Sequence, residues 1–252
     1  RRHSFPTRRS SDLPLAAKIR PKSLDEFIGQ IHLVGAGKPL RIAIEKKHIF
    51  SFILWGPPGV GKTTLARIYA KAINADYYEL SAVSASKDDI KKILEKTYNL
   101  GIEQKQTVLF LDEIHRFNKS QQDAFLPYVE NGTITLVGAT AENPSFYLNA
   151  ALLSRLRVLP LYPLDASALE TLLQKYEKKF IPLPLSQSAR QLVIAWAQGD
   201  GRYLYNLIEN IRNSPGKELD EGSIRHLLQK KSPLFDKGGD QHYNLISALH
   251  KS

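Results

Sequence analysis

The chain has 252 residues, contains no cysteine and no methionine, and carries a net charge of +10 from 35 basic and 25 acidic side chains. The absence of cysteine excludes disulfide bonds, thiolate chemistry and cysteine-ligated zinc. With 42% hydrophobic and 24% charged residues, and no apolar run near the roughly 18 residues of a membrane span, the composition is typical of a globular protein. The basic charge fits contact with a polyanion such as nucleic acid, although many basic proteins bind none.

The first 13 residues are rich in Arg and Ser and lack hydrophobic periodicity, so we expect them to be disordered. They contribute +3 to the net charge, which leaves +7 for residues 14–252. Two interpretations of this leader fit: an organelle transit peptide, or a cloning or sequence-assembly scar, which the absent initiator methionine favours. No apolar segment follows the arginines, so a secretory signal is excluded.

Short apolar segments alternate with helical patterns up to Pro163. Several of these segments are continuously apolar, as strands covered on both faces are, and the alternation predicts a parallel sheet with helices on both sides. The expected strands are residues 51–55, 76–80, 107–111, 133–137 and 157–161. The expected helices between them are residues 62–74, 87–100 after a capping pair of Ser86 and Asp89, and 119–130.

The strand signals stop after Pro163. Residues 166–180, 186–198, 202–212 and 218–231 all show the apolar spacing of amphipathic helices, and breaks containing Pro or Gly separate them. The sequence therefore predicts a second, all-helical domain that begins near residue 164.

Residues 56–63 match the phosphate-loop pattern G-x-x-x-x-G-K-[ST] at every fixed position, between an expected strand and an expected helix. Glycines allow backbone N–H groups to converge on phosphate oxygens, and the helix N-terminus adds partial positive charge. We expect Lys62 to reach the β- and γ-phosphates of a nucleotide and Thr63 to bind Mg²⁺. The predicted nucleotide-binding residues of this loop are Gly56, Pro57, Pro58, Gly59, Val60, Gly61, Lys62, Thr63 and Thr64.

Two carboxylates, Asp112 and Glu113, follow the apolar run at residues 108–111. A buried strand there delivers both acids to the carboxyl edge of the sheet, where open α/β folds bind their ligands. We expect Asp112 to hold Mg²⁺ and Glu113 to act as general base toward the attacking water. Two acids at the end of a strand usually cap the helix that follows. The phosphate loop about 50 residues upstream favours the catalytic interpretation here. Two adjacent acids also argue against a GTPase-type site, which commonly positions its water with Gln.

With these two motifs in place, the chain resembles the AAA+ ATPases and, within them, the replication-associated recombination protein A family, whose eukaryotic relative is the Werner-helicase-interacting protein. The similarity covers residues 14–252, and the stretch from residue 112 to 146 is its most specific part. The segments that carry it are LAAKIRPKSLDEFIGQIHLVG, ILWGPPGVGKTTLA, LFLDEIHRFNKSQQDAFLPYVENGTITLVGATAENPSFYLNAALLSRLRV and DKGGDQHYNLISALHKS.

The resemblance implies roles for residues around the nucleotide. Ile28, in an Arg-Pro to Ile-Gly-Gln segment, would fold over the adenine. A polar contact to the γ-phosphate or to the water would come from Thr140 or Asn143, because Ala141 stands where relatives commonly carry a second threonine. The resemblance leaves the choice between these two residues open.

Three arginines take further roles by the same resemblance. Arg155 would be an arginine finger inserted into the site of a neighbouring subunit, with Arg157 as its competitor. Arg202, at the start of a lid helix, would reach back to the γ-phosphate. His115 and Arg116 lie in the most specific stretch; coupling of the nucleotide to DNA and an ordinary polar loop are equally good interpretations of them.

The resemblance further implies a P-loop AAA+ fold, in which a five-stranded parallel sheet flanked by helices is followed by a small helical lid. It implies ATP and Mg²⁺ as ligands, and ATP hydrolysis coupled to action on DNA at stalled or gapped replication forks. The expected partners are single-stranded, gapped or forked DNA, single-strand-binding protein and further copies of the chain, in the bacterial cytoplasm at the nucleoid and without a membrane. The alternatives are a clamp-loader-like or RuvB-like DNA motor, and an AAA+ protein remodeller that never touches DNA.

The expected domains are a leader over residues 1–13, an AAA+ α/β nucleotide-binding domain over 14–163 and a helical lid over 164–232. Residues 233–252 resemble the beginning of the family's C-terminal oligomerisation region. Family members assemble largely through the part that would follow. We therefore expect these 252 residues to form a monomer or weak oligomer and to be a poor ATPase.

Overall fold

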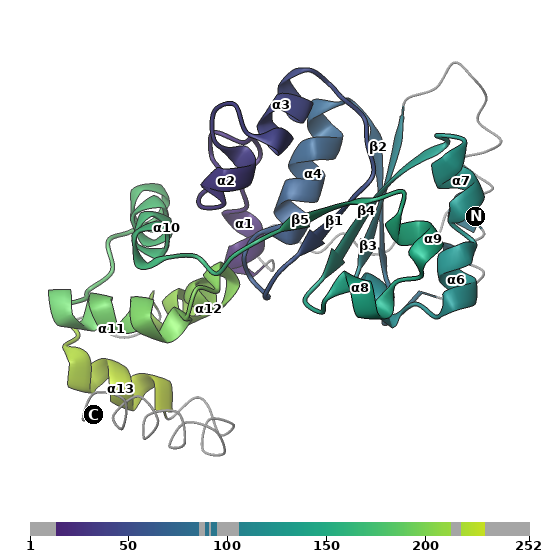
Figure 1. Cartoon of the computed structure of the whole chain (residues 1–252). Helices are drawn as coiled ribbons and strands as arrows, with labels where there is room; N and C mark the ends of the chain where they lie inside the picture. The colour runs from purple at the N-terminus through teal and green to yellow at the C-terminus, as the bar shows by residue number, and fades with distance from the viewer. Residues whose placement is uncertain (1–13, 86–88, 91, 95–105, 213–217, 230–252) are drawn as a thin grey trace, which may run out of the picture.

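The computed structural model describes residues 14–85, 89–90, 92–94, 106–212 and 218–229. A parallel sheet with the strand order β2-β3-β4-β1-β5 lies at the centre of the larger part of the molecule (Figure 1). Its strands are β1 Phe52–Trp55, β2 Asp76–Ser81, β3 Thr107–Asp112, β4 Ile134–Thr140 and β5 Arg157–Pro160. The predicted five-stranded parallel sheet is therefore confirmed, and each strand ends within three residues of its predicted bounds.

Burial along the strands follows their position in the sheet. The interior strands β3 and β4 are buried along almost their whole length, whereas the edge strands β2 and β5 are partly exposed. Side chains of β1 alternate between the faces: Phe52 and Leu54 belong to one apolar cluster and Ile53 to another. Each face of the sheet thus has its own hydrophobic core, as a sheet covered by helices on both sides requires.

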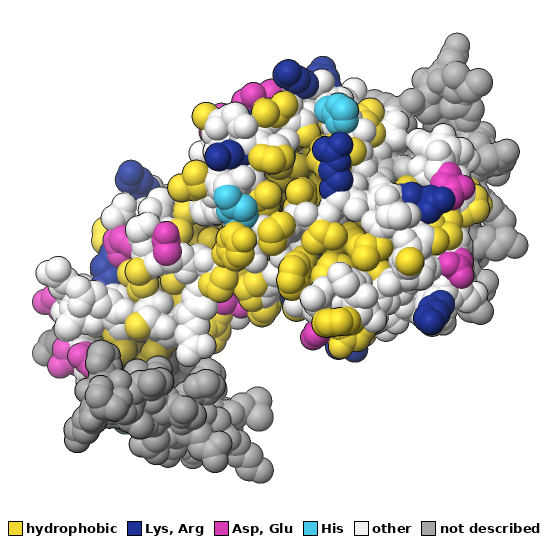
Figure 2. All heavy atoms as spheres, viewed as in Figure 1, with side chains coloured by type: hydrophobic (Ala, Val, Ile, Leu, Met, Phe, Trp, Pro, Cys, Tyr) yellow, Lys and Arg dark blue, Asp and Glu magenta, His cyan; other side chains and the backbone are white. Residues whose placement is uncertain are grey.

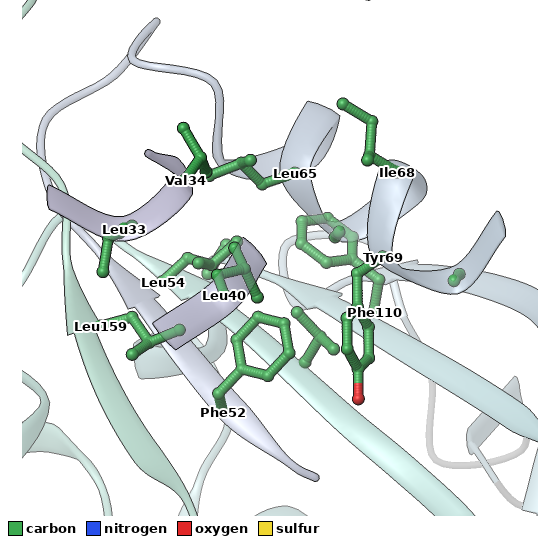
Figure 3. Close-up of a cluster of buried hydrophobic side chains, with 14 of the residues drawn as sticks. Leu33, Val34, Leu40, Phe52, Leu54, Leu65, Ile68, Tyr69, Phe110 and Leu159 are labelled. Atoms are coloured by element: carbon green, nitrogen blue, oxygen red, sulfur yellow. The ribbon is translucent and has the colours of Figure 1, made fainter. Parts of the chain in front are cut away.

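Three helices cover the first face: α2 Ile31–Val34, α3 Pro39–Glu45 and α4 Lys62–Ala72. Figure 3 shows how side chains of these helices, among them Leu40 and Tyr69, pack onto Phe52 and Phe110 of the sheet. The Tyr69 hydroxyl accepts a hydrogen bond from the Phe50 N–H at 3.0 Å, so this fully buried ring also fixes the chain as it enters β1. The same packing fixes α4, and with it the end of the phosphate loop.

Short helices cover the opposite face. They are η2 Ile114–Arg116, α6 Lys119–Asp123, α7 Leu126–Glu130, α8 Pro144–Tyr147 and α9 Ala150–Leu153. The single helix predicted over residues 119–130 is wrong, because the chain forms α6 and α7 with a break between them. Pro127 explains the break: in a continuous helix its ring would clash with the carbonyl of Asp123, and it has no N–H to donate. The break also buries Phe125 completely in the core of this face.

The helical part contains α10 Ala166–Lys179, α11 Gln187–Ala197, α12 Gly201–Arg212 and α13 Glu221–Gln229 (Figure 1). These four helices were predicted, and they share one apolar cluster with Tyr176 and Ile208 at its centre. The first helix of the described chain, α1 Leu15–Lys18, packs into this cluster and not onto the sheet. The Leu15 N–H donates to the Glu209 carboxylate at 2.9 Å, so the start of the described chain lies against the helical part before the chain enters the sheet.

The helix predicted over residues 87–100 lies mostly outside the described residues, as does Ser86 of its capping pair. Residues 89–90 and 92–94 are described and are helical. Within the described ranges, no helix combines the length and the apolar character needed to cross a membrane.

Gln122 joins the short helices of the second face, and its replacement by leucine tests this role. Its buried amide donates to the Phe117 and Tyr147 carbonyls at 2.8 and 3.0 Å and accepts from the Asn149 N–H at 2.8 Å. Leucine would leave these three backbone groups without a partner, at a cost of about 2–3 kcal/mol. We expect Gln122→Leu to lower the free energy of unfolding by that amount, and with it the urea midpoint, and the exposed control Ser120→Ala to change both little. Equal midpoints for the two variants would contradict this role.

Candidate active site

The carboxyl ends of the strands bring the sequence-predicted residues to one edge of the sheet. In the register, Trp55 at the end of β1 lies beside Thr140 at the end of β4, and Ser81 lies beside Asp112 at the end of β3. The Gly56 N–H donates to the Thr140 carbonyl at 3.0 Å, which continues the pairing into the phosphate loop. The loop, the two acids and Thr140 therefore share the edge at which open α/β sheets bind ligands.

The backbone of the phosphate loop requires glycine at its two left-handed positions. Gly59 and Gly61 have φ of 70° and 103°, and Gly61 caps α4, which begins at Lys62. A Cβ atom on Gly61 would lie 2.7 Å from the Phe27 ring, and one on Gly59 would lie 1.6 Å from the carboxylate of Asp200. The loop is thus enclosed on both sides by side chains that occupy the space of the absent Cβ atoms. Its backbone is shaped as a phosphate-binding turn at a helix N-terminus.

The Lys62 ammonium group folds back over the loop. It donates to the carbonyls of Gly56 and Pro57 at 2.5 and 2.8 Å. Burial lowers the pKa of Lys62, and the Arg202 charge adds to this, while the carboxylates of Glu113 and Asp112 oppose it. The ammonium therefore lies within electrostatic range of both acids and of the predicted lid arginine.

The two carboxylates differ in their surroundings. Burial raises the pKa of Asp112 and the adjacent Glu113 charge raises it further, whereas the Glu113 N–H, which donates to Asp112 Oδ1 at 3.2 Å, opposes the shift. A cation bound there would favour the ionised form of Asp112. Glu113 has a φ of 54°, a left-handed conformation that costs a residue with a Cβ about 1–2 kcal/mol. This turn ends β3 and starts η2 directly at the site.

Thr140 and Asn143, the two candidates for the contact with the γ-phosphate, have different surroundings in the structure. Thr140 is fully buried, and its hydroxyl lies 2.9 Å from His115 Nδ1 and accepts from the Glu142 N–H at 3.0 Å. The Asn143 side chain caps α8 by accepting from the Ser145 N–H at 3.0 Å. Thr140 thus belongs to the polar groups at the sheet edge, while the carboxamide oxygen of Asn143 is engaged in holding the next helix.

His115 lies at the site, and its sequence context left two interpretations of it open. Its Nε2 atom lies 3.4 Å from the Glu113 carboxylate, so its ring connects that acid to Thr140. Its place in the most family-specific stretch of the sequence was a signal. Nothing in the spacing shows, however, that the turn at Glu113 brings the ring back over the carboxylate.

The lid reaches the phosphate loop through the start of α12. The Gly201 N–H donates to the Gly59 carbonyl at 3.2 Å, and the Asp200 carboxylate accepts from the Tyr203 N–H at 2.8 Å beside the same glycine. Arg202 is exposed, and its charge acts on Lys62. A cavity of about 330 Å³ lies next to this contact. It is lined by Pro57, Pro58, Trp196, Ala197, Gln198, Gly199, Asp200 and Tyr203.

The segment expected to cover the adenine lies between the loop and the lid. The Phe27 ring packs on Gly61, and Ile28 packs against the helical cluster. The Gln30 amide is buried and pairs with both backbone groups of Tyr162, at 2.6 and 3.0 Å. The segment therefore has an apolar side toward the site and a fixed anchor just beyond β5.

The two candidate finger arginines lie near the amino end of β5, away from the phosphate loop of the same chain. Arg155 pairs with Glu130 at 2.5 Å and donates to the Ala151 carbonyl at 2.6 Å, with 37% of its side chain exposed. Arg157 is the first residue of β5, and its guanidinium lies 5.0 Å from the centre of the Phe50 ring. Arg157 is thus stacked on an aromatic ring of its own chain, whereas Arg155 lies partly exposed at the surface, bound to Glu130 and to the end of α9.

Comparison with known proteins agrees with this geometry. Residues 52–163 match the family described as "ATPase family associated with various cellular activities (AAA)", and residues 178–252 match the AAA C-terminal domain. Replication-associated recombination protein A of Haemophilus influenzae is 46% identical over 250 residues, which are 95% of this chain and 56% of that protein. The protein of that name from Coxiella burnetii is 48% identical over 95% of this chain and 57% of its own length.

More distant relatives share the same architecture. The ATPase WRNIP1 of Dictyostelium discoideum is 40% identical over the whole of this chain and 32% of its own length. Among solved structures, the RuvB Holliday junction branch migration motor of Thermotoga maritima superposes with a TM-score of 0.69 at 27% identity, covering 84% of this chain and 72% of that one. The chain spans just over half the length of the bacterial relatives named above. The matched segments, the five-stranded fold and the phosphate loop together show that this chain belongs to the replication-associated recombination protein A family of AAA+ ATPases.

Proposed function

We propose that this chain is the motor portion of a Mg²⁺-dependent ATPase that acts on DNA at stalled or gapped replication forks. One observation carries the proposal. The phosphate loop, the Asp112–Glu113 pair and Thr140 lie together at the carboxyl edge of the sheet, and the Gly201 N–H of the lid helix α12 donates to the Gly59 carbonyl of that loop at 3.2 Å. A site that has both acids next to a phosphate loop is suited to activating water against a bound phosphoryl group.

In this proposal the nucleotide triphosphate lies on the loop backbone and at the N-terminus of α4. The loop N–H groups and the α4 dipole favour its negative charge, and the Lys62 ammonium turns from the loop carbonyls to the β- and γ-phosphates. Phe27 and Ile28 supply the apolar side of the purine pocket. Arg202 contacts the γ-phosphate from α12, so that a lid in contact with Gly59 responds to the presence of the third phosphate.

Hydrolysis needs a base and a means to neutralise charge. Thr63 and Asp112, together with phosphate oxygens, would hold Mg²⁺, which neutralises charge on the phosphoryl group being transferred. Two protein ligands suffice for such a site because Mg²⁺ keeps several of its water molecules when it binds. Within the described ranges, there is no group of three or more His, Asp or Glu side chains that could hold a metal ion by itself. Glu113 accepts the proton of the attacking water, and Thr140 contacts the γ-phosphate or that water.

The DNA substrate is inferred from the relatives' names and from the charge of the chain. The bacterial relatives are named for replication-associated recombination, and residues 14–252 carry a net charge of +7. Figure 2 shows Lys and Arg side chains scattered over the visible face and not gathered into the stripe that marks many nucleic-acid footprints, so the support comes from the net charge and the relatives' names and not from this face. The proposal includes single-strand-binding protein as a partner, copies of this chain in a ring or other oligomer, and a location at the bacterial nucleoid.

A second function, remodelling of proteins without DNA, would use the same ATPase chemistry. Turnover in the presence of DNA separates the two. We expect single-stranded or gapped DNA to raise the ATP turnover rate, and the stimulation to fall as salt rises, because phosphate contacts release counterions. Unchanged turnover at both low and moderate salt would favour the protein remodeller.

The role of Glu113 is tested by its amide. Glu113→Gln keeps the size of the side chain but removes the base, so we expect ATP binding to persist while turnover falls by about 10²–10⁴-fold. Binding of a fluorescent ATP analogue and phosphate release would be measured on the same protein. Glu142→Gln, which changes an exposed carboxylate at the same sheet edge, serves as the control. Normal turnover of Glu113→Gln would remove Glu113 from the mechanism.

The arginine finger is tested by mixing two inactive proteins. Arg155→Ala lacks the finger but has an intact loop, and Lys62→Ala has the finger but no functional loop. We expect each alone to lose most of its turnover, since such fingers contribute about 10³–10⁵ in rate, and a mixture shown by light scattering to co-assemble to regain a part of it. Arg157→Ala, whose guanidinium stacks on Phe50, is the matched control and should retain activity. If the co-assembled mixture stays inactive, Arg155 does not act on a neighbour.

A further inference from the structure

We infer that His115 is a positioning residue that holds the Glu113 carboxylate and ties it to Thr140. This inference rests on the proposed ATPase function, because it concerns the base of that reaction. His115 is the second residue of η2, directly after the left-handed turn at Glu113. The turn allows a side chain two positions further along the chain to lie back against the carboxylate.

Both nitrogens of the ring face polar groups of the site. Nε2 lies 3.4 Å from Glu113 Oε2, and Nδ1 lies 2.9 Å from the Thr140 hydroxyl. Only 12% of the His115 side chain is exposed, and the Tyr147 ring packs against it edge-on at 5.7 Å between ring centres. The imidazole is therefore confined in an orientation that connects the end of β3 to the end of β4, the strands that carry Glu113 and Thr140.

The two contacts of a neutral ring depend on a single ring proton. When the Thr140 hydroxyl donates to Nδ1, the ring proton is on Nε2 and faces the Glu113 carboxylate oxygen, 3.4 Å away, which attracts it. When that hydroxyl instead donates to the Glu142 carbonyl, 3.2 Å away, Nδ1 must carry the proton to retain its contact with Thr140. Nε2 then turns a lone pair toward the carboxylate, and the attraction is lost. The direction of one hydroxyl group thus determines whether His115 holds Glu113.

A phosphate oxygen is a second acceptor that could turn the Thr140 hydroxyl away from Nδ1. The arrangement therefore gives the proposed γ-phosphate contact a route to the proposed base through one ring. The Tyr147 ring extends the same contact to α8, which leaves the sheet edge toward the surface. His115 itself touches no reacting atom in this scheme, so its effect on turnover passes through Glu113.

The test compares three replacements of His115 by the kcat and KM of ATP hydrolysis. His115→Ala removes both contacts, and we expect kcat to fall about tenfold while KM for ATP stays within about twofold. The amide of His115→Gln extends to the position of Nε2 and restores the contact with Glu113, so it should recover part of kcat. The amide of His115→Asn reaches only as far as Nδ1 and should recover none. His48→Ala, which changes an exposed histidine, is the matched control.

The Gln and Asn variants make the outcome independent of folding. Urea unfolding of all variants would be measured, and a structural role alone would make kcat follow stability, with Gln and Asn alike. That result, or a kcat of His115→Ala within twofold of the parent, would overturn the inference. If the Ala variant does not fold, the order of Gln and Asn decides by itself. Glu113→Gln, assayed beside them, separates the two proposals: normal turnover there would mean that the ATPase assignment of Glu113 has failed, and not only the role of His115.

Discussion

The contact between the phosphate loop and the lid is the constraint on which the site depends. It is made by two glycines: Gly59, whose left-handed backbone leaves the room of a Cβ atom to Asp200, and Gly201, whose N–H reaches the Gly59 carbonyl at 3.2 Å. A Cβ atom on Gly201 would lie 3.0 Å from Leu172 and 3.3 Å from that same carbonyl. The backbone of the phosphate loop is therefore in direct contact with the helical lid at Gly59, a left-handed position of the loop.

Two further connections hold the lid in register with the sheet. The α1 helix, which precedes the sheet in sequence, packs into the core of the lid, and the Gln30 amide binds the backbone of Tyr162, where the chain leaves β5 for the lid. The chain thus passes from the lid core at α1 to the sheet and returns to the lid after β5. The segment with Phe27 and Ile28 lies on the first of these passages. The helical part is thus joined to the rest of the chain at Gly201 and at α1, and the segment that leads into it is anchored at Tyr162. Such a multiple connection favours movement of the lid as one body over local unfolding of single helices.

The sequence predicted the elements that depend on neighbouring residues. It did not predict features that depend on contacts between residues far apart in the chain. The apolar run at residues 108–111 predicted the buried strand β3, and the glycine spacing predicted the phosphate loop. The helix over residues 119–130 was predicted as one element, whereas Pro127 divides it into α6 and α7. The packing of α1 into the lid could not be predicted, because its partner Glu209 lies 194 residues away.

The same division holds inside the site. The loop residues and the two acids follow from a motif and a strand end, and both lie at the predicted sheet edge. The relation of Thr140 to Glu113 does not follow from any spacing, since it needs a left-handed glutamate and a ring that turns back over it. A left-handed conformation at a residue with a Cβ persists only where surrounding contacts determine it. The conformation of Glu113 is therefore determined by the packing of the site and not by its local sequence preference.

The parallel sheet also explains why one chain alone does not complete the proposed site. The loop, the acids and Thr140 follow the carboxyl ends of strands, whereas Arg155 precedes the amino end of β5. A strand of four residues separates these two edges by about 13 Å at roughly 3.3 Å per residue, and every strand of a parallel sheet runs in the same direction. No rotamer of Arg155 therefore brings its guanidinium to the phosphate loop of its own chain. Within the proposed mechanism, Arg155 is useful only to a neighbour, and hydrolysis then depends on how the subunits are arranged.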